Sequence, residues 1–197
     1  MKRLRSFIVM LVVVTGIAVI GYQGWRYLDG IRDSGRLGGS VVVPATYTPV
    51  IRAAAERCPL VPARVLAAQI AAESSWNPEA VSPAGAQGIA QFMPSTWKQY
   101  GIDGDGDGVA DVWNPIDAIH SAAKMNCVNR RLVRKVEGRL LENILAAYNA
   151  GHGAVRRHKG IPPYPETEQY VKRVLTWSQT LTFEEPASPT PVATPTQ

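Results

Sequence analysis

Glu73 is the residue whose sequence surroundings best fit acid–base chemistry. It ends an apolar, alanine-rich run, PARVLAAQIAAE, which begins at Pro62. At helical spacing, its neighbours three and four positions back are Ile70 and Gln69, so its carboxyl lies on the buried side of that helix. Burial favours the neutral form of a carboxyl, which a general acid needs near neutral pH. The alternative is an ordinary glutamate in solvent at a helix end.

An acidic run, DGDGDGVAD, extends from residue 103 to residue 111. It matches the first nine positions of a calcium loop, with acids at positions 1, 3, 5 and 9 and glycine at position 6. The pattern predicts a structural Ca²⁺ held by Asp103, Asp105, Asp107, Val109 and Asp111. It departs at position 12, where Asn114 replaces the bidentate glutamate, and Asp117 could supply the missing oxygen. A solvated acidic turn is the alternative.

Three blocks of sequence carry a further pattern. The first reads ESSWNPEAVSPAGAQGIAQFMPSTW from Glu73, the second is AAYNAG at residues 146–151, and the third is PETEQYV at residues 165–171. In their order and spacing they resemble the soluble lytic transglycosylase family, which is related to goose-type lysozyme. The resemblance covers roughly residues 48–182.

The resemblance implies a role for each matching residue. Glu73 is expected to be the single acid/base catalyst. Ser82 is expected to contact the N-acetyl group of the substrate, and Gln91 and Met93 to line sugar subsites. Tyr148 and Asn149 are expected to hold the glycan and the reacting centre, with Glu166 a supporting acid near Tyr148. The alternatives are that Met93 and Tyr148 fill the core and that Ser82 and Gln91 only hydrogen-bond within a loop.

The implied activity is that of a murein lytic transglycosylase. Such an enzyme cleaves the bond between N-acetylmuramic acid and N-acetylglucosamine in peptidoglycan and leaves a 1,6-anhydromuramoyl end. It is a lyase that acts on a polysaccharide and needs no cofactor for its chemistry. Two alternatives stay open: a lysozyme-like hydrolase of the same bond, and a non-catalytic module that binds peptidoglycan. The expected partners are glycan strands, with the protein a monomer.

The secondary-structure elements that carry these candidate residues are all predicted to be helices. Prolines and apolar residues at helical spacing predict helices that start near Pro49, Pro62, Pro94, Pro115, Leu140 and Glu166. No period-2 run of five or more residues follows residue 44. The expected fold is therefore all-α, a lysozyme-like helical domain with a substrate groove over residues 47–183, preceded by a single transmembrane helix.

The N-terminal segment predicts where the protein is located. Residues 6–25 carry no charge, which is just long enough for a membrane-spanning helix, and Lys2, Arg3 and Arg5 precede them. We expect residues 1–28 to be a single-pass anchor in the cell membrane, with the catalytic domain outside the cytoplasm. A cleaved signal peptide is the alternative, and the protein is then secreted. Residues 29–46 read as a flexible linker, and residues 184–197 as a disordered tail rich in proline and threonine.

An extracytoplasmic location bears on the two cysteines. Outside the cytosol thiols are more often paired than free, so we predict a disulfide between Cys58 and Cys127; two separately buried thiols are the alternative. The composition agrees with a folded domain, because 46% of the 197 residues are hydrophobic and 19% are charged. The net charge of +5 could suit a membrane surface, an anionic wall polymer or nucleic acid. No run of Lys and Arg exceeds two residues, so nucleic acid is not an expected partner.

Overall fold

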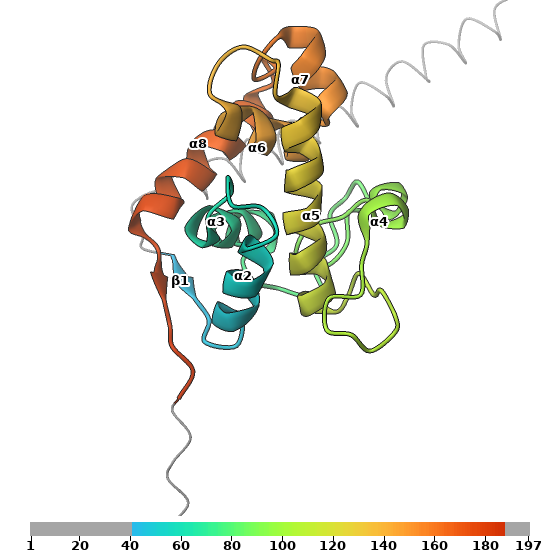
Figure 1. Ribbon diagram of the computed structural model, residues 1–197, viewed down its shortest axis with the longest axis vertical. Helices are drawn as coiled ribbons and strands as arrows, with labels where there is room; N and C mark the ends of the chain where they lie inside the picture. The colour runs from blue at the N-terminus through green and yellow to red at the C-terminus, as the bar shows by residue number, and fades with distance from the viewer. Residues whose placement is uncertain (1–40, 188–197) are drawn as a thin grey trace, which may run out of the picture. The chain divides into compact units, whose positions relative to one another are not determined.

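The computed structural model describes residues 41–187 (Figure 1). The expected membrane anchor and most of the expected tail lie outside these residues. Within residues 41–187, no helix combines the length and the apolar character needed to cross a membrane. The expected all-α domain is confirmed as a mostly helical one.

Seven helices and two very short strands make up the described residues. In chain order they are β1 (Val42–Val43), α2 (Thr48–Ala55), α3 (Ala63–Ser74), α4 (Pro94–Tyr100), α5 (Pro115–Val133), α6 (Leu140–Ala150), α7 (His152–His158), α8 (Pro165–Thr180) and β2 (Thr182–Phe183).

Proline at the first turn starts four of the helices, α2, α4, α5 and α8. Its fixed φ suits the first turn of a helix, and its missing N–H has no partner to lose there. Helix α7 was not predicted, because it has only seven residues and contains Gly153. It forms where Ala154 and Val155 are buried, so tertiary packing rather than helical propensity accounts for it.

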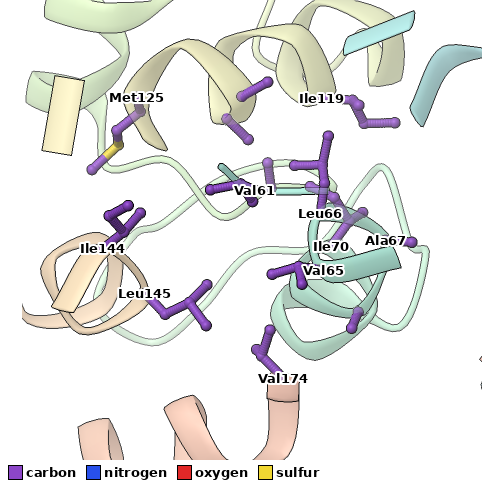
Figure 2. Close-up of a cluster of buried hydrophobic side chains, with 14 of the residues drawn as sticks. Val61, Val65, Leu66, Ala67, Ile70, Ile119, Met125, Ile144, Leu145 and Val174 are labelled. Carbon is purple, nitrogen blue, oxygen red and sulfur yellow. The ribbon is translucent and has the colours of Figure 1, made fainter. Parts of the chain in front are cut away.

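The core lies between α3, α5, α6 and α8 (Figure 2). Leu66 and Ile70 of α3 face Ile119 of α5, while Leu145 of α6 and Val174 of α8 close the other side. Helix α3 is apolar on nearly every face, with seven of its twelve residues buried. It therefore runs through the middle of the domain and brings its C-terminal end, which carries Glu73, against α8.

The two short strands correct the predicted domain boundaries. Strand β1 pairs in parallel with β2, with Val42 opposite Thr182 and Val43 opposite Phe183. Val43 is fully buried, so the C-terminal end of the predicted 29–46 linker belongs to the folded domain. At the other end, Glu185 accepts two hydrogen bonds from Arg52, so the fold continues past the predicted boundary at residue 183.

Two contacts hold the irregular parts of the chain. Cys58, just after α2, forms a disulfide with Cys127 of α5, 69 residues further on. The loop after α3 is fixed at Gly88, whose φ of +72° is in the left-handed region. A Cβ on Gly88 would collide with the backbone carbonyl of Val112, so glycine is required where this loop meets the end of the acidic loop.

Candidate active site

Glu73 lies in the last turn of α3, where the chain turns sharply away. Ser75 and Trp76 follow it with φ of 53° and 69°, a left-handed conformation that is costly for residues other than glycine. The Trp76 ring stacks on Tyr47, with ring centroids 5.9 Å apart. This turn ends the helix directly after the carboxyl and leaves Glu73 only partly buried.

The Glu73 carboxyl has an unusually high pKa. Burial is the main reason that its pKa is raised from 4.5 to about 7. The hydrogen bond from Tyr170 and the positive charge of Arg173 lower the pKa, and the negative charge of Glu166 raises it. All three of these residues belong to α8 at positions i, i+4 and i+7, so they share one face of that helix. Burial therefore raises the pKa of the carboxyl on α3, and one face of α8 adjusts it.

Two tyrosines flank the carboxyl. The Tyr170 hydroxyl donates a hydrogen bond of 2.6 Å to Oε1 of Glu73, and the residue is 4% exposed. Tyr148, from the end of α6, donates its hydroxyl to the backbone oxygen of Ala90 at 2.8 Å. Burial, then the negative charge of Glu73, raises the pKa of both tyrosines well above the usual range. Both hydroxyls therefore stay protonated and act as neutral donors around the carboxyl.

A pair of buried amides lies behind Tyr170. Asn126 of α5 donates a 2.7 Å hydrogen bond to Oε1 of Gln69, and both side chains are fully buried. The amide of Gln69 in turn acts on the Tyr170 hydroxyl, where it opposes the rise in the pKa of that phenol. The two amides and Tyr170 therefore form a polar cluster beside Glu73, in which the amide nitrogen of Gln69 has no hydrogen-bond partner.

Asn149 is held from α8. Its side-chain oxygen accepts a 2.7 Å hydrogen bond from the hydroxyl of Thr167, which is 2% exposed. With its oxygen engaged in this way, the amide nitrogen of Asn149 is the atom left to face a ligand. Thr167 therefore fixes which end of the Asn149 amide is available.

The loop after α3 holds the remaining expected site residues. The Gln91 amide donates to the backbone oxygens of Ala80 and Gly88 at 3.0 and 2.9 Å. The Ser82 hydroxyl accepts from the backbone N–H of Ala86 at 3.0 Å. Both side chains thus shape the loop, while Met93 is 40% exposed at its end and does not fill the core.

The acidic loop gathers a different set of carboxylates from the expected one. Oxygens of Asp103, Asp105 and Asp117 lie within 4.8 Å of one another. Asp117 is fully buried at the start of α5, and its two oxygens accept from the backbone N–H groups of Gly104 and Asp111. Such a group of oxygen donors suits a hard cation such as Ca²⁺.

Asn114, at position 12 of the loop, caps a helix instead of binding a cation. The Asn114 side-chain oxygen caps α5 by accepting from the backbone N–H of Ile116, and its amide donates to Asp105 at 2.7 Å. Asn114 therefore offers no oxygen to the group, and Asp117 takes the place nearest to Asp103 and Asp105. Asp107 and Asp111 accept from the backbone N–H groups of Val109 and Trp113, outside that group.

Tyr170, Thr167 and Arg173 were not predicted as site residues, although the first two belong to the PETEQYV block. Their positions one, four and seven residues after Glu166 were the available signal, because this spacing places them on neighbouring turns of one helix. Which carboxyl they would face depended on how α8 packs against α3.

The comparisons with known proteins agree with this arrangement. The family model described as "Transglycosylase SLT domain" matches residues 50–171, well over half of the chain. The chain belongs to this family. Residues 50–171 include all three sequence blocks and most of the residues described around Glu73, whereas Tyr47 and Arg173 lie outside that range.

Individual relatives of the SLT domain carry related names. Membrane-bound lytic murein transglycosylase B of Escherichia coli is 58% identical over 40 residues, 20% of this chain and 11% of that protein. Membrane-bound lytic murein transglycosylase F of Shewanella sediminis is 38% identical over 94 residues, 47% of this chain and 18% of that protein. Each match thus spans less than a fifth of the length of the relative.

A solved structure extends the likeness to the fold. The 70 kDa soluble lytic transglycosylase Slt70 from Escherichia coli superposes with a TM-score of 0.52 at 26% identity. The superposition covers 68% of this chain and 24% of Slt70.

Proposed function

We propose that the protein is a lytic transglycosylase that cleaves peptidoglycan between N-acetylmuramic acid and N-acetylglucosamine. The observation that carries the proposal is the carboxyl of Glu73, with a pKa of about 7, which can lose and regain a proton near neutral pH. Membership of the SLT domain family and the names of its relatives support the choice of substrate.

In the first step, protonated Glu73 gives its proton to the oxygen that links the two sugars, and the bond from that oxygen to the muramoyl anomeric carbon breaks. Positive charge then develops on the anomeric carbon. The acetamide of the same sugar stabilises this charge, as in substrate-assisted glycosidases. The leaving sugar departs with a free hydroxyl.

In the second step, Glu73 is a carboxylate and takes the proton of the muramoyl 6-hydroxyl. The 6-oxygen attacks the anomeric carbon of its own sugar and closes the 1,6-anhydro ring. Glu73 is protonated again by the 6-hydroxyl proton, so the protein is unchanged and no water is consumed. The reaction as written needs no metal or cofactor.

The residues around Glu73 suit these two steps. The Tyr170 hydroxyl is hydrogen-bonded to one carboxyl oxygen and stabilises the carboxylate formed after the first step. Asn149, oriented by Thr167, presents its amide nitrogen as a donor to the sugar. Ser82, Gln91 and Met93 are assigned to the sugar subsites, in a loop tied to Tyr148 through Ala90.

Digestion of purified peptidoglycan tests the proposal. Mass spectrometry of the products separates anhydromuramoyl ends, which are lighter by one water, from hydrolysed ends. We expect anhydro ends to dominate. Hydrolysed ends alone would identify a lysozyme-like hydrolase, and glycan binding without products would identify a non-catalytic module.

We further propose that the acidic loop holds a structural Ca²⁺ through Asp103, Asp105 and Asp117. The end of the acidic loop contacts the loop after α3, where the carbonyl of Val112 lies against Gly88. A cation that orders the acidic loop would therefore also restrain the loop after α3. Removal of Ca²⁺ by a chelator is expected to lower the melting temperature, and re-addition to restore it. The matched control is D103N/D105N, which should show neither effect. No shift in the wild type and no bound metal would refute the site.

The N-terminal segment belongs to the same proposal. Residues 1–28 are proposed to anchor the protein in the cell membrane, with the SLT domain outside, where its substrate lies. Fractionation of cells that express the full chain is expected to place it in the membrane fraction at full-length mass. A shortened chain in the soluble fraction would show cleavage of a signal peptide instead.

A further inference from the structure

Charge in the described residues is separated along helix α5. Five aspartates and no Lys or Arg occupy residues 103–117, before and within its first turn, whereas residues 130–159 hold eight Lys or Arg and two Glu. Helix α5 has 19 residues, so these groups stand roughly 28 Å apart. The catalytic chemistry proposed above uses neither group of charges.

The basic group surrounds an open hollow of about 510 Å³. We call it the basic hollow, and its cations are Arg131, Arg134, Lys135, Arg156 and Lys159. They come from the end of α5, the turn after it, and the end of α7, which packs against α5 (Figure 1). All five are exposed.

Helix ends do not account for so many cations. The C-terminal ends of α5 and α7 each present about half a negative charge, which attracts Lys and Arg to the last turn. Glu137, also at the hollow, adds one full negative charge. About three positive charges are therefore left over. None of the five cations has a side-chain hydrogen bond or ion pair with another residue in the 41–187 range, so no described contact offsets these remaining charges.

We propose that the basic hollow binds a linear polymer that carries phosphate groups. Three of the five cations are arginines, whose planar guanidinium groups suit phosphate oxygens. The cations are spread over two helix ends around an open depression, which fits a chain of charges better than one small anion. No aromatic residue lines the hollow, whereas proteins that bind single-stranded nucleic acid stack its bases on aromatic rings.

An anionic membrane surface fits the hollow less well. Segments that lie on membranes combine basic residues with bulky apolar ones that enter the lipid. Leu132, at 37% exposed, and the partly buried Val136 are the apolar residues that line the hollow. The position of the hollow also suits a polymer close to the glycan. The seven residues of α7, about 10 Å in length, lead from the hollow to Gly151, two residues after Asn149.

Binding of fluorescently labelled linear polyphosphate to the full chain in neutral detergent tests the proposal. R134E/K159E reverses two charges in the hollow, and K98E/K172E makes the same change at two exposed lysines elsewhere. We expect the first variant to weaken binding about tenfold and the second by no more than about twofold, because each exposed charge contributes modestly. Equal weakening by both variants, or by neither, would overturn the proposal.

Two further measurements complete the experiment. R131Q/R156Q, a milder change in the same hollow, should also weaken binding, and unchanged binding in this variant would contradict the proposal. Competition by an anionic lipid, added to the same assay in neutral detergent, addresses the other source of phosphate. The anionic lipid is expected not to displace labelled polyphosphate from the wild type. If it displaces polyphosphate at a matched concentration of phosphate groups, the hollow is a membrane site and the proposal is wrong. None of these assays requires turnover, so their failure is separate from failure of the proposed catalytic function.

Discussion

At the scale of single residues, Glu73 combines two opposed requirements. Burial holds its proton near neutral pH, while the Tyr170 hydroxyl and Arg173 limit the cost of its ionised form. A group that must donate a proton and then accept one needs both states within reach. The residues that supply this balance all lie on α8, so the acidity of Glu73 can be altered without changing the glutamate itself.

The raised pKa predicts that Glu73 makes stability depend on pH. The folded state keeps the proton up to about pH 7, whereas an ordinary carboxyl loses it near 4.5. The stabilisation is therefore complete below about pH 4.5 and is lost as the pH rises through 7, by about 3 kcal/mol in total. Urea unfolding at pH 4 and pH 8.5 should show this loss in wild type and not in Glu73→Gln. Glu79→Gln, at an exposed position, is the control and should behave as wild type; a similar loss in Glu73→Gln would contradict the prediction.

Two substitutions on α8 should move the pH profile of turnover in opposite directions. Tyr170→Phe removes a hydrogen bond to the carboxylate, so the pKa of Glu73 rises and the alkaline limb moves up by about 0.7 unit, for a bond of about 1 kcal/mol. Glu166→Gln removes a negative charge, so the alkaline limb moves down, and its loss of activity should be smaller than that of Glu73→Gln. Tyr164→Phe, an exposed tyrosine, is the control. Shifts in the same direction would show that α8 does not act through the charge state of Glu73.

At the scale of elements, α8 also fixes the end of α6. The hydroxyl of Thr167 on α8 donates a hydrogen bond to the side-chain oxygen of Asn149 at the end of α6, close to the site. Thr167→Val keeps the shape of the side chain and removes the donor, so we expect about 1 kcal/mol of lost stability and a fall in kcat of about tenfold with a smaller change in KM. Thr167→Ser should restore turnover. If Thr167→Val leaves kcat unchanged, Thr167 is structural only.

The sequence predicted most elements but not how their faces meet. Proline at the first turn marked the starts of α4 and α5, which begin at Pro94 and Pro115 as predicted, because proline acts locally on the backbone. Glu73 could be found because apolar neighbours at helical spacing suggested burial and because the block that follows it resembles the lytic transglycosylase pattern. The roles of Tyr170 and Thr167 could not, since they depend on the packing of α8 against α3 and α6. Asp117 was foreseen only as a possible ligand, because its place in the acidic group depends on how the loop folds back on α5.

At the scale of the whole molecule, a disulfide ties two distant parts of the domain together. The bond between Cys58 and Cys127 encloses a loop with a sequence separation of 69 residues. Closing a loop of that size restricts the unfolded chain and is expected to stabilise the domain by roughly 4 kcal/mol in the chain-entropy model. Cys58→Ala/Cys127→Ala should lower the guanidinium midpoint accordingly, with reduced wild type as the matched sample. Equal mass after alkylation with and without reductant would show that the bond is absent.

The arrangement of charge and catalysis along the chain also belongs to this scale. Helix α5 carries the acidic loop at its start, the disulfide along its length and the basic hollow at its end, while Glu73 lies on α3 beside it. The proposed metal, the proposed polymer contact and the proposed catalytic carboxyl therefore occupy separate places on one domain. Each can be removed by substitution without touching the other two.

The central claim is that Glu73 alone serves as acid and base. Glu73→Gln keeps the size of the side chain but can neither donate a proton to the leaving oxygen nor take one from the 6-hydroxyl. Acid–base steps contribute about 10²- to 10⁴-fold each. We therefore expect Glu73→Gln to lower turnover of peptidoglycan to anhydromuramoyl products by about 10⁴-fold or more. Binding of peptidoglycan should be largely retained. Turnover above about a tenth of wild type would be a far smaller loss than removal of an acid–base group causes. Such a result would contradict the single-residue mechanism and direct attention to Glu166 or Glu79.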